Sequence, residues 1–298
     1  MTGVLTKVGT ARWRLYLALT KPRIIELLLV TTIPTMFLAA DGFPNLALVA
    51  LTLVGGTLAA GGANVLNCYL DRDIDALMHR TAHRPSATGE ISGPKILIFG
   101  FVLSVAAIGF LGLFVNVVSA WLGAFAISFY VIGYTLLLKR RTSQNIVWGG
   151  IAGCMPVLIG WSAVTGSLSV VPVVLFLIVF FWTPPHYWPL SLRYREDYAR
   201  AGIPMLPVDH DGLTVTRHIL WHSWAMVSVS ILLIPVAHMS WFYAFCALGL
   251  GAAFLWQAYA LRSRVRSGAP DLKSMVLFHF SISYLALIFL VIGVDPFV

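Results

Sequence analysis

About nine long apolar stretches, separated by short polar segments, occupy most of this 298-residue sequence. Each is close to the roughly 20 residues that an α-helix needs to cross the apolar core of a bilayer. Only 11% of the residues are charged, whereas soluble domains average about 25%. The sequence therefore predicts an all-α, polytopic membrane bundle of about nine transmembrane helices. The predicted spans are residues 24–40, 46–69, 96–115, 117–138, 146–164, 169–190, 218–237, 241–261 and 275–295.

The positive charges alternate along the chain with the predicted spans. All 20 lysine and arginine residues lie in the N-terminal segment and in every second connection, whereas the intervening connections, such as 41–45 and 165–169, carry none. Cytoplasmic loops of membrane proteins are the ones enriched in lysine and arginine. We therefore expect a multi-pass protein of the cytoplasmic (inner) membrane, with its N-terminus in the cytoplasm and its C-terminus outside.

The net charge of +8 belongs to one face of the membrane in this topology. Such charge meets the anionic head groups of membrane lipids, and we expect no nucleic-acid partner. The first residues lack the apolar core of a secretory signal peptide. Residues 1–298 are accordingly expected to form a single integral-membrane domain, in which residues 1–15 are a flexible cytoplasmic tail.

An acidic segment ends the second predicted span. Asn67, Asp71 and Asp75 fall four residues apart and therefore share one helical face. Mg²⁺ prefers oxygen ligands, takes one or two protein carboxylates, and shares its remaining positions with water and substrate phosphates. The segment predicts a site for Mg²⁺-diphosphate in which these three residues hold the metal and serve catalysis. The alternative is an ordinary acidic helix end, neutralised by nearby arginines at positions 72, 80 and 84.

Basic residues near this face are candidates for binding the diphosphate. Arg80 and Arg84 follow it in a turn-rich loop and can clamp phosphate oxygens through charge-assisted hydrogen bonds. Lys139, after the fourth span, and Arg193, after the sixth, are further candidate donors. Stabilising the charge that develops on a leaving group is a common source of catalytic power.

The motif Asn67-x-x-x-Asp71-x-x-x-Asp75, followed by Arg80-Thr and Arg84-Pro-x-x-x-Gly89-x-Ile, resembles the first signature of intramembrane prenyltransferases of the UbiA type. Segments 19–25, 134–150 and 182–198 are similar to the branch of that family that farnesylates heme. The resemblance implies nine helices around a central cavity that opens toward lipid, with Mg²⁺ as the cofactor. It implies farnesyl diphosphate and heme b as substrates, and heme O and diphosphate as products. It also suggests hand-over of the product to a heme A synthase or to terminal oxidase assembly.

One segment departs from the family pattern. Quinone-type members carry a second Asp-x-x-x-Asp motif after the sixth span, where this chain has Arg193-Tyr-Arg-Glu-Asp197. Two hypotheses remain open. Either Glu196 and Asp197 hold a second Mg²⁺, or Arg193 and Arg195 replace its charge beside the diphosphate.

His186 is the predicted heme-binding residue, together with the neighbouring aromatic residues Trp182 and Tyr187. An ionisable residue inside a membrane span indicates function, although a hydrogen-bonded histidine that only packs is the alternative. The preceding Pro184-Pro185 pair predicts a break in the sixth helix that opens space at this position.

The resemblance implies an enzyme that adds a farnesyl group and water to a vinyl group of heme b. A family member acting on an aromatic quinone precursor is the nearest alternative. A membrane cation transporter is an alternative from another class. Transporters place their ion sites near the membrane midplane, whereas these acids cluster at one face beside basic loops, which favours a diphosphate site.

Overall fold

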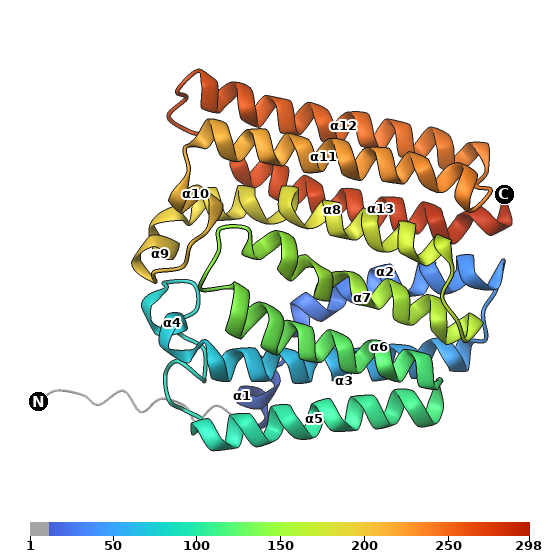
Figure 1. Ribbon diagram of the computed structural model, residues 1–298, viewed down its shortest axis with the longest axis horizontal. Coiled ribbons are helices and arrows are strands. Elements are labelled where there is room, and N and C mark those ends of the chain that lie inside the picture. The colour runs from blue at the N-terminus through green and yellow to red at the C-terminus, as the bar shows by residue number, and fades with distance from the viewer. Residues whose placement is uncertain (1–11) are drawn as a thin grey trace, which may run out of the picture.

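Long helices run side by side, each antiparallel to its neighbour in the chain, in the computed structural model of this protein (Figure 1). The structure describes residues 12–298, and for residues 23–29 it describes the backbone alone. The long helices are α2 (Pro22–Ala40), α3 (Leu46–Leu70), α5 (Gly93–Phe114), α6 (Val117–Ser128) continued by the π-helix η1 (Phe129–Leu138), α7 (Asn145–Thr165), α8 (Val170–Arg193), α11 (Gly212–Val236), α12 (Trp241–Arg266) and α13 (Ser274–Val294). The short ones are α1 (Arg12–Leu19), α4 (Arg72–Leu77), α9 (Arg195–Arg200), α10 (Leu206–Asp209) and the 3₁₀ turn η2 (Asp295–Phe297).

The all-helical prediction is confirmed, since each predicted span coincides with one long helix. In the described part of the chain, eight helices are long and apolar enough to cross a membrane, and 30–40 of α2 is a shorter apolar segment. The start of α11 differs most, because it begins at Gly212 rather than at residue 218. There the Asp211 side chain accepts a hydrogen bond from the backbone N–H of Thr214 and caps the helix.

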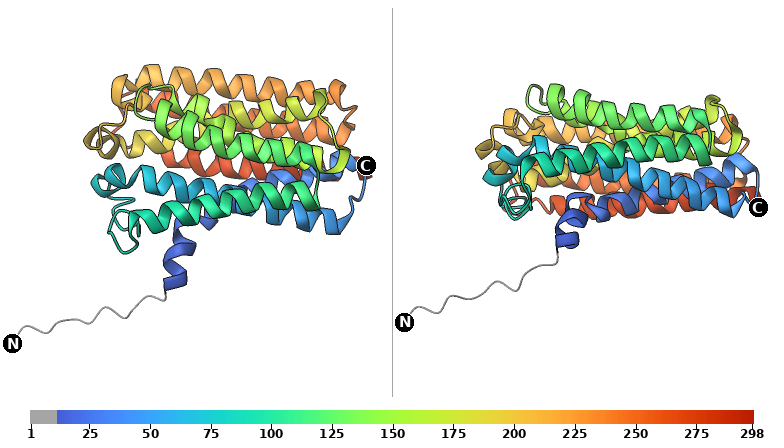
Figure 2. Two further views of the ribbon diagram at one scale, coloured as in Figure 1. Left: turned by 60° about the horizontal axis from the view of Figure 1, so that its bottom comes forward. Right: turned by 90° about the horizontal axis from the view of Figure 1, so that it is seen from below.

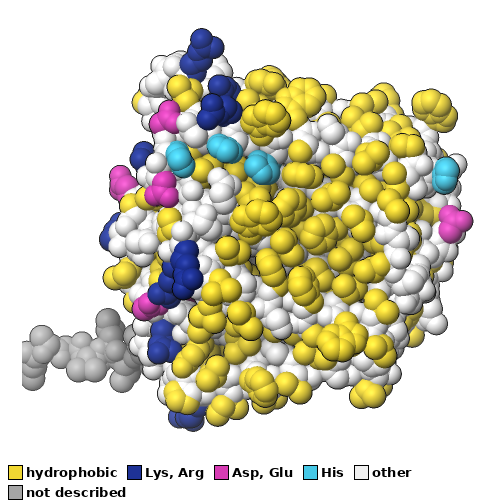
Figure 3. Space-filling view, viewed as in Figure 1, with side chains coloured by type: hydrophobic (Ala, Val, Ile, Leu, Met, Phe, Trp, Pro, Cys, Tyr) yellow, Lys and Arg dark blue, Asp and Glu magenta, His cyan; other side chains and the backbone are white. Residues whose placement is uncertain are grey.

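Charged and apolar side chains are separated along the bundle. The short helices α4, α9 and α10 lie together at one end, and tight turns connect the long helices at the other end (Figure 1). On the face shown in Figure 3, lysine and arginine gather at the end that carries these short helices, and hydrophobic side chains cover the wide middle. This pattern suits a bundle whose middle lies in lipid and whose basic end lies at a membrane surface.

The predicted flexible tail, residues 1–15, is described only in part. Residues 1–11 lie outside the described residues. Residues 12–15 form the first half of α1. This helix is steeply inclined to the helices of the bundle (Figure 2).

Small residues bring α3 and α5 into close contact. A Cβ atom added at Gly62 would lie 2.6 Å from the Ser104 hydroxyl and 2.9 Å from its backbone nitrogen. One added at Gly100 would lie 2.8 Å from Leu66. All three distances are shorter than real Cβ contacts allow, so only glycine permits this approach of the two helices. Gly62 of the second span therefore serves helix packing, as does Gly55 against Leu111, whereas Gly56 lines the apolar side of the helix and meets no atom within 4 Å.

Helix α8 passes through its prolines without interruption, so the predicted break at Pro184–Pro185 is wrong. Proline removes a backbone donor and interrupts soluble helices. In membrane helices it is tolerated because neighbouring helices and polar side chains satisfy the freed carbonyl groups. Because α8 stays helical, His186 and Tyr187 keep their positions along it, and both line the internal cavity described next.

Candidate active site

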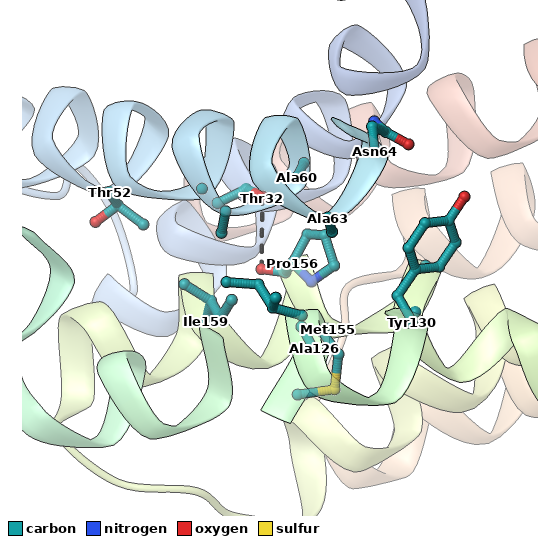
Figure 4. A pocket seen from close by; sticks show the side chains of 15 residues that line it. Thr32, Thr52, Ala60, Ala63, Asn64, Ala126, Tyr130, Met155, Pro156 and Ile159 are labelled. Atoms are coloured by element: carbon teal, nitrogen blue, oxygen red, sulfur yellow. Dashed lines mark hydrogen bonds between the residues drawn. The ribbon is translucent and has the colours of Figure 1, made fainter. Parts of the chain in front are cut away.

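A cavity of about 460 Å³ lies inside the basic end of the bundle. Helices α3, α7, α8 and α13, the π-helix η1 and the loop after α4 contribute its walls. A smaller apolar cavity of about 160 Å³ shares Tyr130 and Gly153 with it. Figure 4 shows this apolar cavity extending from Tyr130 and Asn64 toward Thr52 and Ile159. The central cavity that the sequence resemblance implies is thus present, and it has a polar and an apolar part.

Two residues of the acidic face, Asn67 and Asp75, line the polar part of the cavity, and Asp71 is buried beside them. α3 ends at Leu70 and α4 begins at Arg72, yet the backbone keeps helical spacing through Asp71, whose N–H donates to Asn67 O and whose carbonyl accepts from Asp75 N–H. Asn67, Asp71 and Asp75 are all buried, with at most 3% of their surface exposed. The predicted three-residue face is therefore formed.

Each residue of this face has a cation beside it. Asn67 Oδ1 accepts a hydrogen bond from Lys21 Nζ at 2.7 Å, and burial lowers the pKa of that ammonium from its ordinary value. Asp71 Oδ2 accepts from Lys139 Nζ. Both oxygens of Asp75 accept from Arg84 Nη1, at 2.9 and 2.8 Å. Cations from three distant parts of the chain meet here.

The donor set fits a Mg²⁺ ion. Asp71 Oδ1 is buried and has no hydrogen-bond partner, and the nearest ion-pair nitrogen, Arg140 Nη2, is 3.8 Å away. A buried carboxylate oxygen without a donor is costly, and a divalent cation would satisfy it. Two carboxylates and one amide oxygen match the ligand preference of Mg²⁺.

The alternative of a simply neutralised helix end accounts for only part of the geometry. Among the three arginines it invokes, Arg84 alone bonds to the acidic face. Arg72 lies over the ring of Tyr69, and Arg80 lies among tyrosines. Asp73, on the other side of the turn, is exposed and pairs with Arg140, whose hydrogen bonds lower the pKa of this carboxyl.

The π-helix η1 brings Lys139 to the cavity. Lys139 follows Tyr130 by nine residues, which is about two and a half turns of an α-helix and would place the two on opposite faces. The wider turn of a π-helix, roughly 4.4 residues with i→i+5 hydrogen bonds, returns them to the same face. The bond from Lys139 N–H to Tyr134 O has this spacing, and all three residues line the cavity.

Thr135, on the same π-helix, determines which way the amide of Asn67 points. Its hydroxyl donates to Tyr130 O at 2.8 Å, which leaves its oxygen free to accept from Asn67 Nδ2 at 3.1 Å. Asn67 Nδ2 also donates to Asp71 Oδ2. With both amide hydrogens engaged, Asn67 Oδ1 is the atom presented to Lys21 and to a metal.

Thr135→Val is expected to weaken divalent-metal binding about tenfold, the lower end of what outer-shell partners contribute. Valine keeps the shape but removes the acceptor that orients the Asn67 amide. Binding of Mn²⁺ to the purified protein, followed by electron paramagnetic resonance, measures the effect without turnover. Thr135→Ser should restore affinity. Thr216→Val, which removes a buried hydroxyl bonded only within α11, is the matched control, and equal affinities in all variants would contradict the role of Thr135.

The charged residues predicted at the end of α8 and on α9 do not line the cavity, and this part of the prediction is corrected. Arg193, Arg195 and Glu196 are exposed, and none of them lines the cavity. Asp197 is buried, but its carboxylate accepts from Arg200 at 3.0 Å. Among the described side chains no three His, Cys, Asp or Glu residues gather as a metal site. The reason is helical register, because α9 turns Tyr198 rather than its charged residues toward the cavity.

Arg80 makes its hydrogen bond to a tyrosine and not to the acidic face. Its Nη2 donates to the Tyr198 hydroxyl at 3.1 Å, and that hydroxyl lies 3.0 Å from the hydroxyl of Tyr187. Its guanidinium also lies over the rings of Tyr194 and Tyr198. Burial raises the pKa of the Tyr198 hydroxyl, so this group stays protonated. Arg80 and Tyr187 are thus brought together, on the side of the cavity formed by α8 and α9.

His186 is held rigidly in the cavity wall. Its ring is stacked between Trp182 and Phe278, with centroid distances of 4.3 and 4.7 Å. Its Nδ1 lies 2.7 Å from Ser281 Oγ, and that hydroxyl donates its single proton to Phe278 O at 2.6 Å. Nδ1 must therefore be the donor to Ser281, which leaves the lone pair of the neutral ring on Nε2.

Several site residues were not assigned a role from the sequence. Lys21 and Thr135 lie within segments 19–25 and 134–150, which already carried the family resemblance, so a signal for them existed. Tyr198 lies at the end of the third such segment. Phe278 and Ser281 of α13 gave no local signal, because only packing against α8 brings them to His186.

A membrane helix bundle with an oxygen-rich face at the polar end of a partly apolar cavity has the architecture of an intramembrane prenyltransferase. The chain belongs to the UbiA prenyltransferase family, whose model matches residues 28–282, and it is a multi-pass membrane protein. It is 58% identical over 289 residues to the protoheme IX farnesyltransferase of Streptomyces coelicolor, covering 96% of this chain and 92% of that protein. The protoheme IX farnesyltransferase of Streptomyces avermitilis is 57% identical, with 96% and 95% covered.

Two solved structures share the fold at lower sequence identity. That of digeranylgeranylglyceryl phosphate synthase superposes with a TM-score of 0.78 at 16% identity, covering 96% of this chain and 98% of the other. A UbiA homolog from Archaeoglobus fulgidus bound to DMAPP and Mg²⁺ gives 0.69 at 18% identity, covering 94% and 99%. At such identities the likeness establishes the common fold.

Proposed function

We propose that this protein transfers the farnesyl group of farnesyl diphosphate to a vinyl group of heme b, with addition of water, and releases heme O and diphosphate. The observation that carries the proposal is one cavity with an acidic, cation-lined face at one side and a stacked histidine at another. The sequence likeness to protoheme IX farnesyltransferases supports the same reaction.

The acidic face is the proposed donor site. Asn67, Asp71 and Asp75 would hold Mg²⁺, which neutralises charge on the leaving diphosphate when it is bound. Lys21, Arg84 and Lys139 line the same part of the cavity and can donate to phosphate oxygens. The apolar cavity beyond Tyr130 would receive the isoprenoid chain, since none of the described residues that line it is charged.

The chemistry requires a cation to form and to be captured. The C–O bond of the allylic diphosphate breaks, and its electron pair leaves with the diphosphate. The outer vinyl carbon of heme b bonds to the farnesyl carbon, and the inner carbon becomes cationic and takes up water, which loses a proton. Tyr130 and Tyr134 stack with ring centroids 5.6 Å apart at the junction of the two cavities, where their faces can stabilise the allylic cation.

His186 is the proposed heme ligand. The hydrogen bond of Nδ1 to Ser281 fixes the neutral tautomer in which Nε2 can bind iron, the usual arrangement for metal-binding histidines. Trp182 lies parallel to the imidazole and donates its own N–H to Ser281 O at 2.7 Å, which holds the pair in place. Tyr187, predicted with them, lies on the Arg80 side of the cavity.

The deciding experiment incubates the purified protein with heme b and farnesyl diphosphate, with and without Mg²⁺, and identifies the products by mass. The proposal expects heme O and diphosphate in the presence of Mg²⁺ and neither after chelation. A parallel incubation with 4-hydroxybenzoate tests a quinone precursor as acceptor. Product from that incubation and none from heme b would replace the proposal.

The basic end of the bundle is proposed to face the cytoplasm of a bacterial inner membrane, as the positive-inside rule requires. Single cysteines placed in a cysteine-free background should label from outside at residues 41–45 and 165–169. Those at 80–95 and 139–145 should label only from the cytoplasmic side. One loop with reversed accessibility would contradict the topology.

Residues 1–298 would act as one domain, and heme O would pass to a heme A synthase or to terminal oxidase assembly.

A further inference from the structure

Of the four lysine and arginine side chains that line the cavity, Lys21 donates to the amide oxygen of Asn67, and Arg80 bonds neither to a carboxylate of the described chain nor to the acidic face. Lys139 and Arg84 form ion pairs with Asp71 and Asp75, whereas no ion pair of Arg80 with a described Asp or Glu exists. Its Nε is buried and lacks a hydrogen-bond partner. A largely buried cation without an anion is costly, so this arginine is prepared for an anion that the protein does not itself supply.

Two tyrosine hydroxyls complete the surroundings of this guanidinium. Arg80, Tyr187 and Tyr198 all line the cavity, and their polar atoms form a chain from Nη2 through Tyr198 to Tyr187, at 3.1 and 3.0 Å. The cation and the hydroxyl groups therefore converge from the loop after α4, from α8 and from α9. An anion entering here would meet a planar guanidinium fork, which matches the geometry of a carboxylate.

The position of Arg80, Tyr187 and Tyr198 favours binding of the acceptor, heme b, over binding of the prenyl donor, farnesyl diphosphate. The acidic face, which is the proposed site of the diphosphate, already has three cations beside it. They are Lys21, Arg84 and Lys139. Arg80 instead contacts tyrosines of α8 and α9, and Tyr187 directly follows His186 on α8. Heme b carries two propionate carboxylates, and its two vinyl groups lie on the opposite half of the porphyrin. A propionate held at the basic end of the bundle would direct the vinyl groups into the membrane, toward the apolar cavity.

We propose that Arg80, with the hydroxyls of Tyr187 and Tyr198, forms a carboxylate subsite that binds a propionate of heme b and thereby orients the vinyl edge. This inference rests on the proposed function and gives Arg80 a different ligand from the diphosphate that the sequence pattern predicts for it. It adds a specific requirement, which is that the acceptor must carry a free carboxylate. A porphyrin whose propionates are esterified keeps the vinyl groups and the iron but loses that recognition.

The test compares heme b with its dimethyl ester in the wild type and in Arg80→Gln. The wild type should prefer heme b. Arg80→Gln should raise the KM for heme b at least about tenfold, as expected when a site built to bond a substrate group loses its partner. The KM for the dimethyl ester and that for farnesyl diphosphate should stay within about twofold. Arg195→Gln, an exposed arginine on α9 near Tyr198, is the control and should change none of them.

A second variant keeps the test decisive if Arg80→Gln folds poorly. Tyr198→Phe retains the ring and removes only the hydroxyl, and it should shift the KM in the same direction by a smaller factor. A rise in the KM for farnesyl diphosphate instead of heme b would assign Arg80 to the diphosphate and overturn the inference. Equal use of heme b and the ester by the wild type would also overturn it.

Failure of the proposed function can be told apart from failure of this inference. If no heme O forms, titration of the Soret absorption still measures the affinity for heme b and for its ester. Weaker binding of heme b alone in Arg80→Gln would then uphold the carboxylate subsite without the farnesyl transfer. Unchanged binding of both porphyrins, or no binding at all by the wild type, would reject the subsite.

Discussion

Asp71→Asn and Asp75→Asn are each expected to lower kcat about 10²–10³-fold, the effect of losing one group that stabilises transition-state charge. Asparagine keeps the shape of the side chain but removes the charge that would hold Mg²⁺. Both residues are buried and paired with Lys139 and Arg84, so unfolding must be measured beside the rate. Steady-state formation of heme O at saturating Mg²⁺ gives kcat, and binding of heme b should remain close to that of the wild type.

Asp73→Asn is the matched control for these two variants. Asp73 lies between Asp71 and Asp75 in the sequence, but its side chain is 61% exposed and pairs with Arg140 at the surface. Exposed ion pairs contribute about 0–1 kcal/mol, so the control should retain nearly full activity and stability. Near-normal turnover of both Asp71→Asn and Asp75→Asn would remove the assignment of Mg²⁺ to this face.

Gly153→Leu is expected to switch the prenyl donor from farnesyl diphosphate to geranyl diphosphate, which is one isoprene unit shorter. Gly153 lines both cavities, and a Cβ added there meets no atom within 4 Å. A leucine can therefore be attached there without a clash at its Cβ, and its side chain would extend into the space shared by the two cavities. The ratio of kcat/KM for geranyl over farnesyl diphosphate should rise about 10–100-fold, since fitting of apolar groups discriminates on this scale.

Gly109→Leu controls for the added bulk. Gly109 lies on α5, is exposed, and likewise has no atom within 4 Å of an added Cβ. This variant should keep the preference for farnesyl diphosphate. If Gly153→Leu also kept it, with unchanged kcat/KM, the isoprenoid chain would have to lie outside the apolar cavity.

The sequence alone determined the bundle, because a bilayer imposes strong and local requirements. Each span must be apolar over about 20 residues and must satisfy its backbone groups within its own helix. The positions of all predicted spans could therefore be inferred from local composition. The face of Asn67, Asp71 and Asp75 could be inferred for a similar reason, since a spacing of four residues is a property of one helix.

Only the tertiary structure decided which other residues join that face. Lys21 is 46 residues from Asn67, and Arg80 is 118 residues from Tyr198, so no local pattern relates them. A one-residue step around a helix turns a side chain by roughly 100°, which is enough to move it from the cavity to the surface. That rotation excluded Arg193 and Arg195, and the π-helical turn brought Lys139 in. Packing of helices remote in sequence, rather than local periodicity, therefore selected the cations and aromatic rings of the site.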